Sequence, residues 1–207
     1  MILLPVSYFP PIEYFQLITK DKNVVLELFE NYPKQTLRNR CYLYSSNGKI
    51  YLSVPVQRKI NNFALTKDIK ISYNEPWQKI HLKSIESAYN HSPYYEYYND
   101  YFVCFFERKF IFLLDLNIEI LNKLLKICKI QSKIAFTENF IQGTLGNSDF
   151  RNFFNNLSVN HKVTNFKNKE YSQVFDSKHG FIPNLSILDL LFNVGPEISN
   201  FLYENTV

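Results

Sequence analysis

Residues 2–29, ILLPVSYFPPIEYFQLITKDKNVVLELF, decide the fold. Ile2–Val6 is a short apolar run typical of a buried strand, and the Pro-Pro pair after it favours a helix over about Ile12–Thr19, because proline suits the first turn of a helix. Asn23–Phe29 returns as a second apolar strand. The order strand, helix, strand predicts a β-α-β unit in a parallel sheet, with the turn at residues 7–11 on the edge where such sheets hold ligands.

Beyond residue 29 the sequence predicts a hairpin, a helical insertion and a second β-α-β portion. Asn47-Gly48 between two apolar runs is typical of a tight hairpin turn. Helices are expected after Pro76, after Pro93, where aromatic residues recur at helical spacing as a packing face, and from Asp115 or Asn117. The remaining expected elements are strands at 41–44, 50–56, 69–73, 133–137 and 162–166 and a helix at 149–157. The fold class is therefore α/β, with one domain over residues 1–207, a mostly parallel sheet, a β-hairpin and a helical insertion at roughly 76–130.

The last helix has its own local signals. Ser186 is suited to the N-cap, and Asp189 three positions later imitates a capping box. Gly195-Pro196 supplies a stop. These signals explain Ser186, Asp189 and Gly195 structurally, but they leave Asn184 and Asn193 unexplained.

Composition and charge exclude several classes of protein. The chain has 46% hydrophobic residues, with 19 Phe and 15 Tyr, which fits a packed globular core, and its net charge of +4 is too dispersed to favour nucleic acid as a partner. The three cysteines lack metal-site or disulfide spacing. The richest apolar zone, residues 101–116, is interrupted by charges and falls short of the roughly 20 apolar residues that cross a bilayer. We therefore expect a cytoplasmic protein without membrane insertion, metal or cofactor; the oligomeric state stays open.

Common nucleotide-binding and hydrolase motifs are missing from the sequence. Arg38-Asn39-Arg40 instead places two guanidinium groups in a short polar segment, where they can hold a phosphate or carboxylate. The alternative is that both arginines are solvated and pair with Glu27 or Glu30.

Two further groups of residues can carry chemistry. His81 falls on the apolar stripe of the helix after Pro76, where a buried imidazole can act as a general base or serve only as a hydrogen-bonded core residue. Tyr171 and Gln173 lie in a long loop before the last helix and offer a hydroxyl and an amide suited to orienting a sugar. Anchoring of that loop is the alternative for this pair.

Several segments, in this order, give the chain its resemblance to a known family. They are Pro5-x-x-Tyr8-x-Pro10-x-x-x-Tyr14-Phe15, Gln35-x-x-Arg38-Asn39-Arg40, Leu52–Val56, Trp77 with His81–Ile85 and Ala88-Tyr89, Ser92-Pro93-Tyr94, Tyr171-x-Gln173-x-Phe175 and the closing helix. With these the chain resembles the WbqC-like family, bacterial proteins associated with surface-polysaccharide gene clusters. Many relatives open with Gln-Pro where this chain has Leu4-Pro5, so no role is carried over to that position.

The resemblance implies a role in O-antigen or capsule assembly, with a glycine or other aminoacyl transferase activity on an amino sugar. We expect catalysis from His81 and Lys83 and a nucleotide sugar or amino sugar as the small-molecule partner. The substrate-binding residues that it implies are Tyr8, Tyr14, Arg38, Asn39, Arg40, Tyr171, Gln173 and Asn193. Whether the chain is an enzyme stays open, since a non-catalytic nucleotide-sugar-binding or scaffold protein of the same pathway fits the absence of a recognisable nucleophile.

Overall fold

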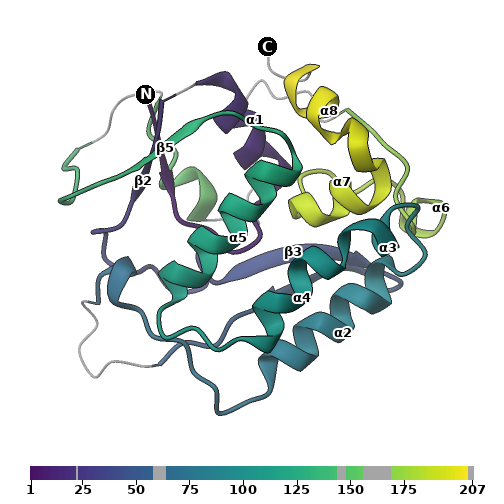
Figure 1. Ribbon diagram of the computed structural model, residues 1–207, viewed down its shortest axis with the longest axis horizontal. Helices are drawn as coiled ribbons and strands as arrows, with labels where there is room; N and C mark the ends of the chain where they lie inside the picture. The colour runs from purple at the N-terminus through teal and green to yellow at the C-terminus, as the bar shows by residue number, and fades with distance from the viewer. Residues whose placement is uncertain (22, 58–63, 144–147, 156–168, 205–207) are drawn as a thin grey trace.

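A three-stranded parallel sheet forms one side of the molecule. The computed structural model describes residues 1–21, 23–57, 64–143, 148–155 and 169–204. Strand β1 (Ile2–Pro5), helix α1 (Ile12–Lys20) and strand β2 (Asn23–Glu27) form the expected β-α-β unit, and β5 (Lys133–Phe136) pairs in parallel with β2 (Figure 1). The strand order is β1-β2-β5, which confirms the parallel sheet predicted from the sequence.

The predicted hairpin is also present. Strands β3 (Arg40–Ser45) and β4 (Gly48–Ser53) pair antiparallel, with Tyr42 opposite Tyr51, and Gly48 at the turn has φ +91°. The strand expected at residues 69–73 is reduced to isolated bridges, one between Val56 and Ile71 and one between Lys70 and Phe112. The chain after β4 therefore continues as an extended ribbon.

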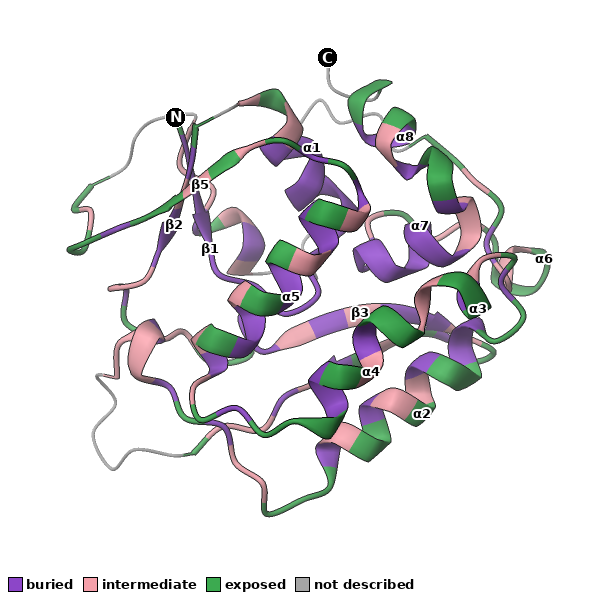
Figure 2. Cartoon of the chain, viewed as in Figure 1, coloured by how far each residue is buried: buried purple, intermediate pink, exposed green. Residues whose placement is uncertain are grey.

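Helices cover the hairpin and the sheet. They are α2 (Trp77–Tyr89), α3 (Tyr95–Tyr98), α4 (Asp100–Glu107), α5 (Leu113–Ile127), α6 (Asp176–His179), α7 (Ile187–Val194) and α8 (Ile198–Glu204), with 3-10 turns η1 (Thr66–Asp68), η3 (Phe153–Asn155) and η4 (Gly195–Glu197). Figure 2 shows α7 buried along most of its length, from Ile187 to Phe192, whereas α2, α4 and α5 alternate buried and exposed positions. No helix in the described part of the chain is long and apolar enough to cross a membrane.

Three helix expectations need correction. The aromatic segment after Pro93 is divided at Asn99 into α3 and α4, and its stripe does not all pack, since Tyr97 and Tyr101 are 74% and 48% exposed. The third long helix begins at Leu113, ahead of the polar residues expected to cap it, because buried Leu113 and Leu116 already lie on its packed face.

The third correction concerns residues 149–157. Asp149 bridges to Leu3, and the amide of Phe150 donates to the Leu3 carbonyl at 2.9 Å, so this segment first extends the open edge of β1. Only the short turn η3 follows within the described residues. The strand expected at 162–166 lies outside them.

At the start of α7 the sequence prediction is confirmed in part. The Ser186 side chain caps the helix by accepting from the amide of Leu188 at 3.3 Å. Asp189 does not complete a capping box, because its carboxylate accepts hydrogen bonds from Tyr171 and Gln173 instead. Gly195 ends α7, and the chain then turns through η4 into α8.

Candidate functional site

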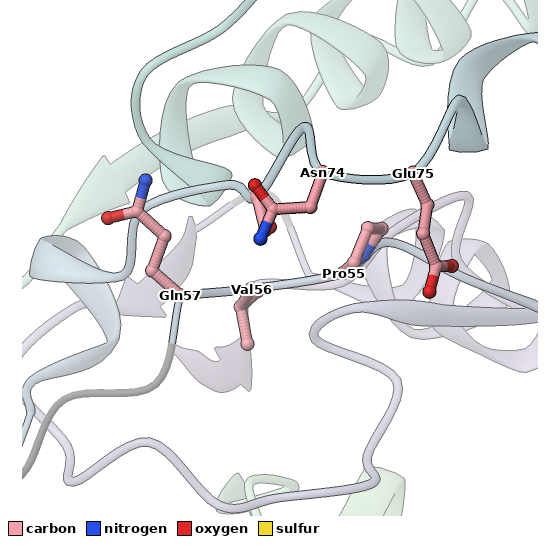
Figure 3. Close-up of a pocket in the computed structure, with 6 residues that line it drawn as sticks. Pro55, Val56, Gln57, Asn74 and Glu75 are labelled. Atoms are coloured by element: carbon pink, nitrogen blue, oxygen red, sulfur yellow. The ribbon is translucent and has the colours of Figure 1, made fainter.

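An open pocket lies where the ribbon after β4 separates from the segment leading into α2. It has a volume of about 640 Å³ and is lined by Pro55, Val56, Gln57, Ser72, Asn74 and Glu75. The two walls are held together by the Val56–Ile71 bridge and by the amide of Ser72, which donates to the Pro55 carbonyl at 2.8 Å. In Figure 3 the side chains of Asn74 and Glu75 extend toward the Pro55–Gln57 wall, while Val56 points the other way.

The polar side chains of this pocket are available to a ligand. Among the described residues, the side chains of Ser72, Asn74 and Glu75 form no hydrogen bond or ion pair. Gln57 uses its amide nitrogen on the Ile71 carbonyl at 3.2 Å and keeps its amide oxygen free. A hydroxyl, two amides and one carboxylate on an open wall suit the hydroxyl and amine groups of a small polar molecule. The sequence analysis placed Pro55, Val56 and Ser72 in expected strands and did not single out any of the six lining residues as a binding residue.

His81 lies on the inner side of the hairpin and is 3% exposed. Its Nδ1 is 2.9 Å from the hydroxyl of Tyr8, and Trp77 packs edge-on against its ring at 5.1 Å between centroids. Burial lowers the pKa of His81 to about 4, with the Ser53 backbone acting in the opposite direction. The imidazole is therefore neutral near pH 7. Tyr8 and His81, which the sequence analysis proposed separately as a binding and a catalytic residue, are in direct contact.

Cys41 also belongs to this inner cluster. Its side chain is buried, and burial raises the pKa of the thiol well above its ordinary value. It also contributes to the raised pKa of Tyr8. A buried thiol with a raised pKa is a packing residue rather than an activated nucleophile.

Arg38 is fully buried and its guanidinium is occupied by protein groups. Nε and Nη2 donate to the two oxygens of Glu30 at 2.6 and 2.7 Å, and Nη1 donates to Thr36 and Asn155 at 3.2 and 2.5 Å. This is a bidentate ion pair of the kind that arginine forms with carboxylates. The sequence analysis offered two interpretations of Arg38, anion binding and pairing with a glutamate. The structure shows pairing with Glu30, and the pair is buried rather than solvated.

Two more predicted binding residues make contacts within the fold. The Tyr14 hydroxyl donates to the Pro5 carbonyl at 3.0 Å beneath the end of β1. Asn39 donates from Nδ2 to the Val54 carbonyl at 2.9 Å, which continues the pairing of the hairpin beyond β4. Tyr14 thus holds the end of β1, and Asn39 holds the segment that follows β4.

Arg40 faces the opposite way from the Tyr8–His81 cluster. Neighbouring residues of a strand point to opposite faces, so Arg40 projects outward while Cys41 projects inward. The Arg40 guanidinium carbon lies 5.1 Å from the ring centre of Tyr51. Lys83 is exposed on the outer side of α2. Arg38, Arg40 and His81 therefore lie in three different environments and do not converge on one site.

Tyr171 and Gln173 meet around Asp189. The Tyr171 hydroxyl and the Gln173 amide nitrogen donate to Oδ2 of Asp189 at 2.5 and 2.8 Å, and Gln173 also exchanges two hydrogen bonds with the backbone of Ile182. Burial raises the pKa of Asp189 to about 6. Asn193 donates to the Asp189 carbonyl at 2.8 Å one turn below. These contacts anchor the loop before α7, and none of the three predicted residues reaches the pocket at Pro55–Gln57.

A second junction joins the N-termini of α1 and α7. Asn184, with φ +53°, accepts from the amide of Glu13 at 3.1 Å and donates to the Glu13 carboxylate at 2.8 Å. The Ile12 amide donates to the Leu185 carbonyl at 3.1 Å, and the Ile187 amide donates to the Pro10 carbonyl at 2.9 Å. Asn184 therefore caps a helix that begins more than 170 residues earlier in the chain, a role that local sequence signals do not reveal.

The raised pKa of Glu13 gives this junction a pH dependence. Burial raises that pKa from 4.5 to about 7. The native state therefore holds a proton that the unfolded state releases, so this group lowers the free energy of unfolding as pH rises from 4.5 to 7, by up to about 1.4 kcal/mol per pH unit.

Glu13→Gln keeps an acceptor for Asn184 and removes the titration. We expect urea denaturation to show the variant gaining stability relative to wild type across this window, and Glu96→Gln, at an exposed site, to follow wild type throughout. If the free energy of unfolding changed with pH in the same way for wild type and both variants, Glu13 would not be the source of the pH dependence.

Comparison with known proteins identifies the family of this chain. The model of the WbqC-like protein family matches residues 6–151 and 137–200. A relative from Mycobacterium tuberculosis, described as uncharacterized protein Rv1507c, is 27% identical over 95% of this chain and 94% of its own length. No solved structure matches the chain. Because the family match covers most of the sequence, as the ordered segments from Tyr8 to the last helix predict, the chain belongs to the WbqC-like protein family.

Proposed function

We propose that this protein transfers an aminoacyl, glycyl or other acyl group to a nucleotide-activated amino sugar during assembly of a surface polysaccharide. The observation that carries the proposal is the open pocket between Pro55–Gln57 and Ser72–Glu75, whose hydroxyl, amide and carboxylate groups suit a sugar that bears an amine. Family membership supports the pathway, since the resemblance implies a role in O-antigen or capsule assembly.

Glu75 is the titratable group among the described residues that line the pocket. In the proposed reaction the sugar amine attacks the acyl carbon of an activated donor, a C–N bond forms, and the leaving group departs with the electron pair of the broken bond. The proton of the attacking amine passes to the Glu75 carboxylate, which also pairs with the ammonium form of the sugar before reaction. Ser72 and Asn74 orient the sugar hydroxyls.

His81 and Lys83 take other places in this proposal than the sequence suggested. Neither lines the pocket, and His81 is 3% exposed. In this proposal His81 is a positioning residue: it contacts Tyr8, Trp77 and the Ser53 backbone, and Ser53 lies two residues before Pro55 in the pocket wall. Lys83 lies on the solvent side of α2.

The test is a transfer assay with purified protein, a panel of nucleotide-activated amino sugars and activated aminoacyl or acyl donors, with the product detected as a mass increase of the sugar. We expect Glu75→Gln to lower turnover by about 100-fold or more, as for loss of a general base, with an unchanged melting temperature. Glu86→Gln, an exposed glutamate on α2, is the matched control and should retain full turnover. Wild-type turnover in the Glu75→Gln variant would refute the assigned role of Glu75.

A non-catalytic nucleotide-sugar-binding or scaffold role is the second candidate. It is favoured by the burial of His81 and Cys41, which keeps an imidazole and a thiol of the inner cluster away from a substrate. A ligand that binds only the native state raises the melting temperature whether or not it reacts. Stabilisation by nucleotide sugars, without any mass change across the donor panel, would identify this role.

A further inference from the structure

The outer face of the hairpin carries a row of two cations and two aromatic rings. Arg40 lies over the ring of Tyr51 at 5.1 Å, the rings of Tyr51 and Tyr42 are 6.3 Å apart, and the Lys49 ammonium lies 4.4 Å from the centre of the Tyr42 ring. Tyr42 and Tyr51 are direct cross-strand partners. We call these four residues the tyrosine platform. Its rings are held in place by cation–π contacts at both ends, and Tyr51 is 58% exposed to solvent.

Charge on this face is positive and not neutralised. The sequence from Arg40 to Gln57 contains two basic residues, Arg40 and Lys49, and no aspartate or glutamate. Among the described residues neither Arg40 nor Lys49 forms an ion pair, and Nε of Arg40 is shielded from solvent without a hydrogen-bond partner. The platform therefore presents unpaired donors for an anion beside an aromatic surface.

The platform and the pocket share one face of a continuous extended segment. Side chains alternate along a strand, and exposure follows that alternation from Lys49 through Tyr51 and Ser53 to Pro55 and Gln57, while Leu52 and Val54 are buried. Pro55 and Gln57 line the pocket. At about 3.3 Å per residue, Tyr51 and Pro55 are roughly 13 Å apart along this face. A ligand with a flat ring at one end and a sugar at the other can span both.

We infer that the tyrosine platform binds the nucleoside diphosphate portion of the activated sugar, with the base stacked on Tyr51 and the phosphates paired with Arg40, which lies opposite Ser53 on the pocket side of Tyr51. This inference rests on the proposed function, because it supplies the nucleotide end of the same substrate. An aromatic side chain can stack against any of the nucleotide bases. Arginine is the residue best suited to bind phosphate oxygens. The sugar then extends toward Glu75 in the pocket.

A nucleic acid strand fits this surface less well than a single nucleotide. The two rings occupy one cross-strand position, and the next outward residues toward the pocket are Ser53 and Pro55, which offer neither a second stacking site nor a charge. Proteins that bind single strands repeat stacking sites and cations along a groove. The platform therefore offers a stacking surface for one nucleotide.

Calorimetric titration of the full chain with UDP, dTDP, GDP and CDP tests this inference without any turnover. We expect at least one of them to bind, Tyr51→Ala to weaken that binding by about tenfold or more, and Tyr51→Phe, which keeps the ring, to bind like wild type. Arg40→Gln should weaken binding and reduce its dependence on salt. Tyr97→Ala, at an exposed tyrosine on α3, is the matched control and should bind like wild type.

The outcomes separate this inference from the proposed function. If transfer to the sugar occurs but Tyr51→Ala leaves nucleotide affinity and the KM for the nucleotide sugar unchanged, the platform is overturned while the function stands. If a nucleoside diphosphate binds and Tyr51→Ala removes it, the platform is supported even where no transfer is seen. Absence of binding by all four nucleotides, or tenfold tighter binding of a short oligonucleotide, would also overturn it.

Discussion

Replacement of Arg38 by Met should lower the free energy of unfolding by about 3 to 5 kcal/mol, the usual cost of leaving one partner of a buried ion pair without the other. The Arg38 side chain is fully buried, and both oxygens of Glu30 depend on it. The variant therefore keeps the Glu30 carboxylate in a poorly solvated place without its ion-pair partner. Urea denaturation followed by circular dichroism measures the loss.

Two variants give this experiment its controls. Arg108→Met breaks the exposed pair with Glu119, for which we expect only about 0 to 1 kcal/mol. Glu30→Leu combined with Arg38→Met removes both charges, so part of the lost stability should return. Equal losses in Arg38→Met and Arg108→Met would show that the buried pair has no special weight. The same set of variants matters for function, because a loss of activity in an Arg38 variant must be separated from a loss of fold.

Gly195→Ala should destabilise the protein by about 3 kcal/mol or more, since overpacking and an unfavourable backbone conformation add. Gly195 has φ +60° and ψ −127°, a conformation that suits glycine, and an added Cβ would lie 2.5 Å from Cγ of Tyr94. Tyr94 cannot easily move away, because its amide donates to the Phe192 carbonyl at 3.0 Å. Thermal and urea unfolding measure the effect.

Gly180→Ala separates the two causes. Gly180 has φ +75°, but an added Cβ would meet nothing within 4 Å, so only the backbone cost of about 1 to 2 kcal/mol is expected. Tyr94→Ala should rescue part of the stability of Gly195→Ala by removing the clash. If Gly180→Ala and Gly195→Ala are equally destabilised, contact with Tyr94 contributes nothing.

The elements that were predictable from the sequence are those with local signals. The β1-α1-β2 unit, the hairpin and α2 follow from short apolar runs, an Asn-Gly turn and a proline-started helix, and each is confirmed. The start of α5 was misplaced because polar capping candidates at Asp115 and Asn117 outweighed an apolar turn already buried by tertiary packing. Helix starts without a side-chain cap leave little trace in a sequence.

The candidate site was less predictable because contacts between distant residues decide it. No local pattern shows that Arg38 is saturated by Glu30 and Asn155, or that Tyr171 and Gln173 converge on Asp189. The pocket groups Ser72, Asn74 and Glu75 sit in an irregular segment with no motif. Direct contact between Tyr8 and His81, by contrast, joins two residues that the sequence had singled out separately.

The link between Asn184 and Glu13 constrains the order of folding. The first turn of α1 receives its cap, and the edge at Pro10–Ile12 its backbone partners, only from residues 184–187. During synthesis these backbone groups bond to water until residues 184–187 have left the ribosome. Closing so long a loop is entropically costly and slow. The first turn of α1 can therefore reach its native contacts only after residues 184–187 have been made.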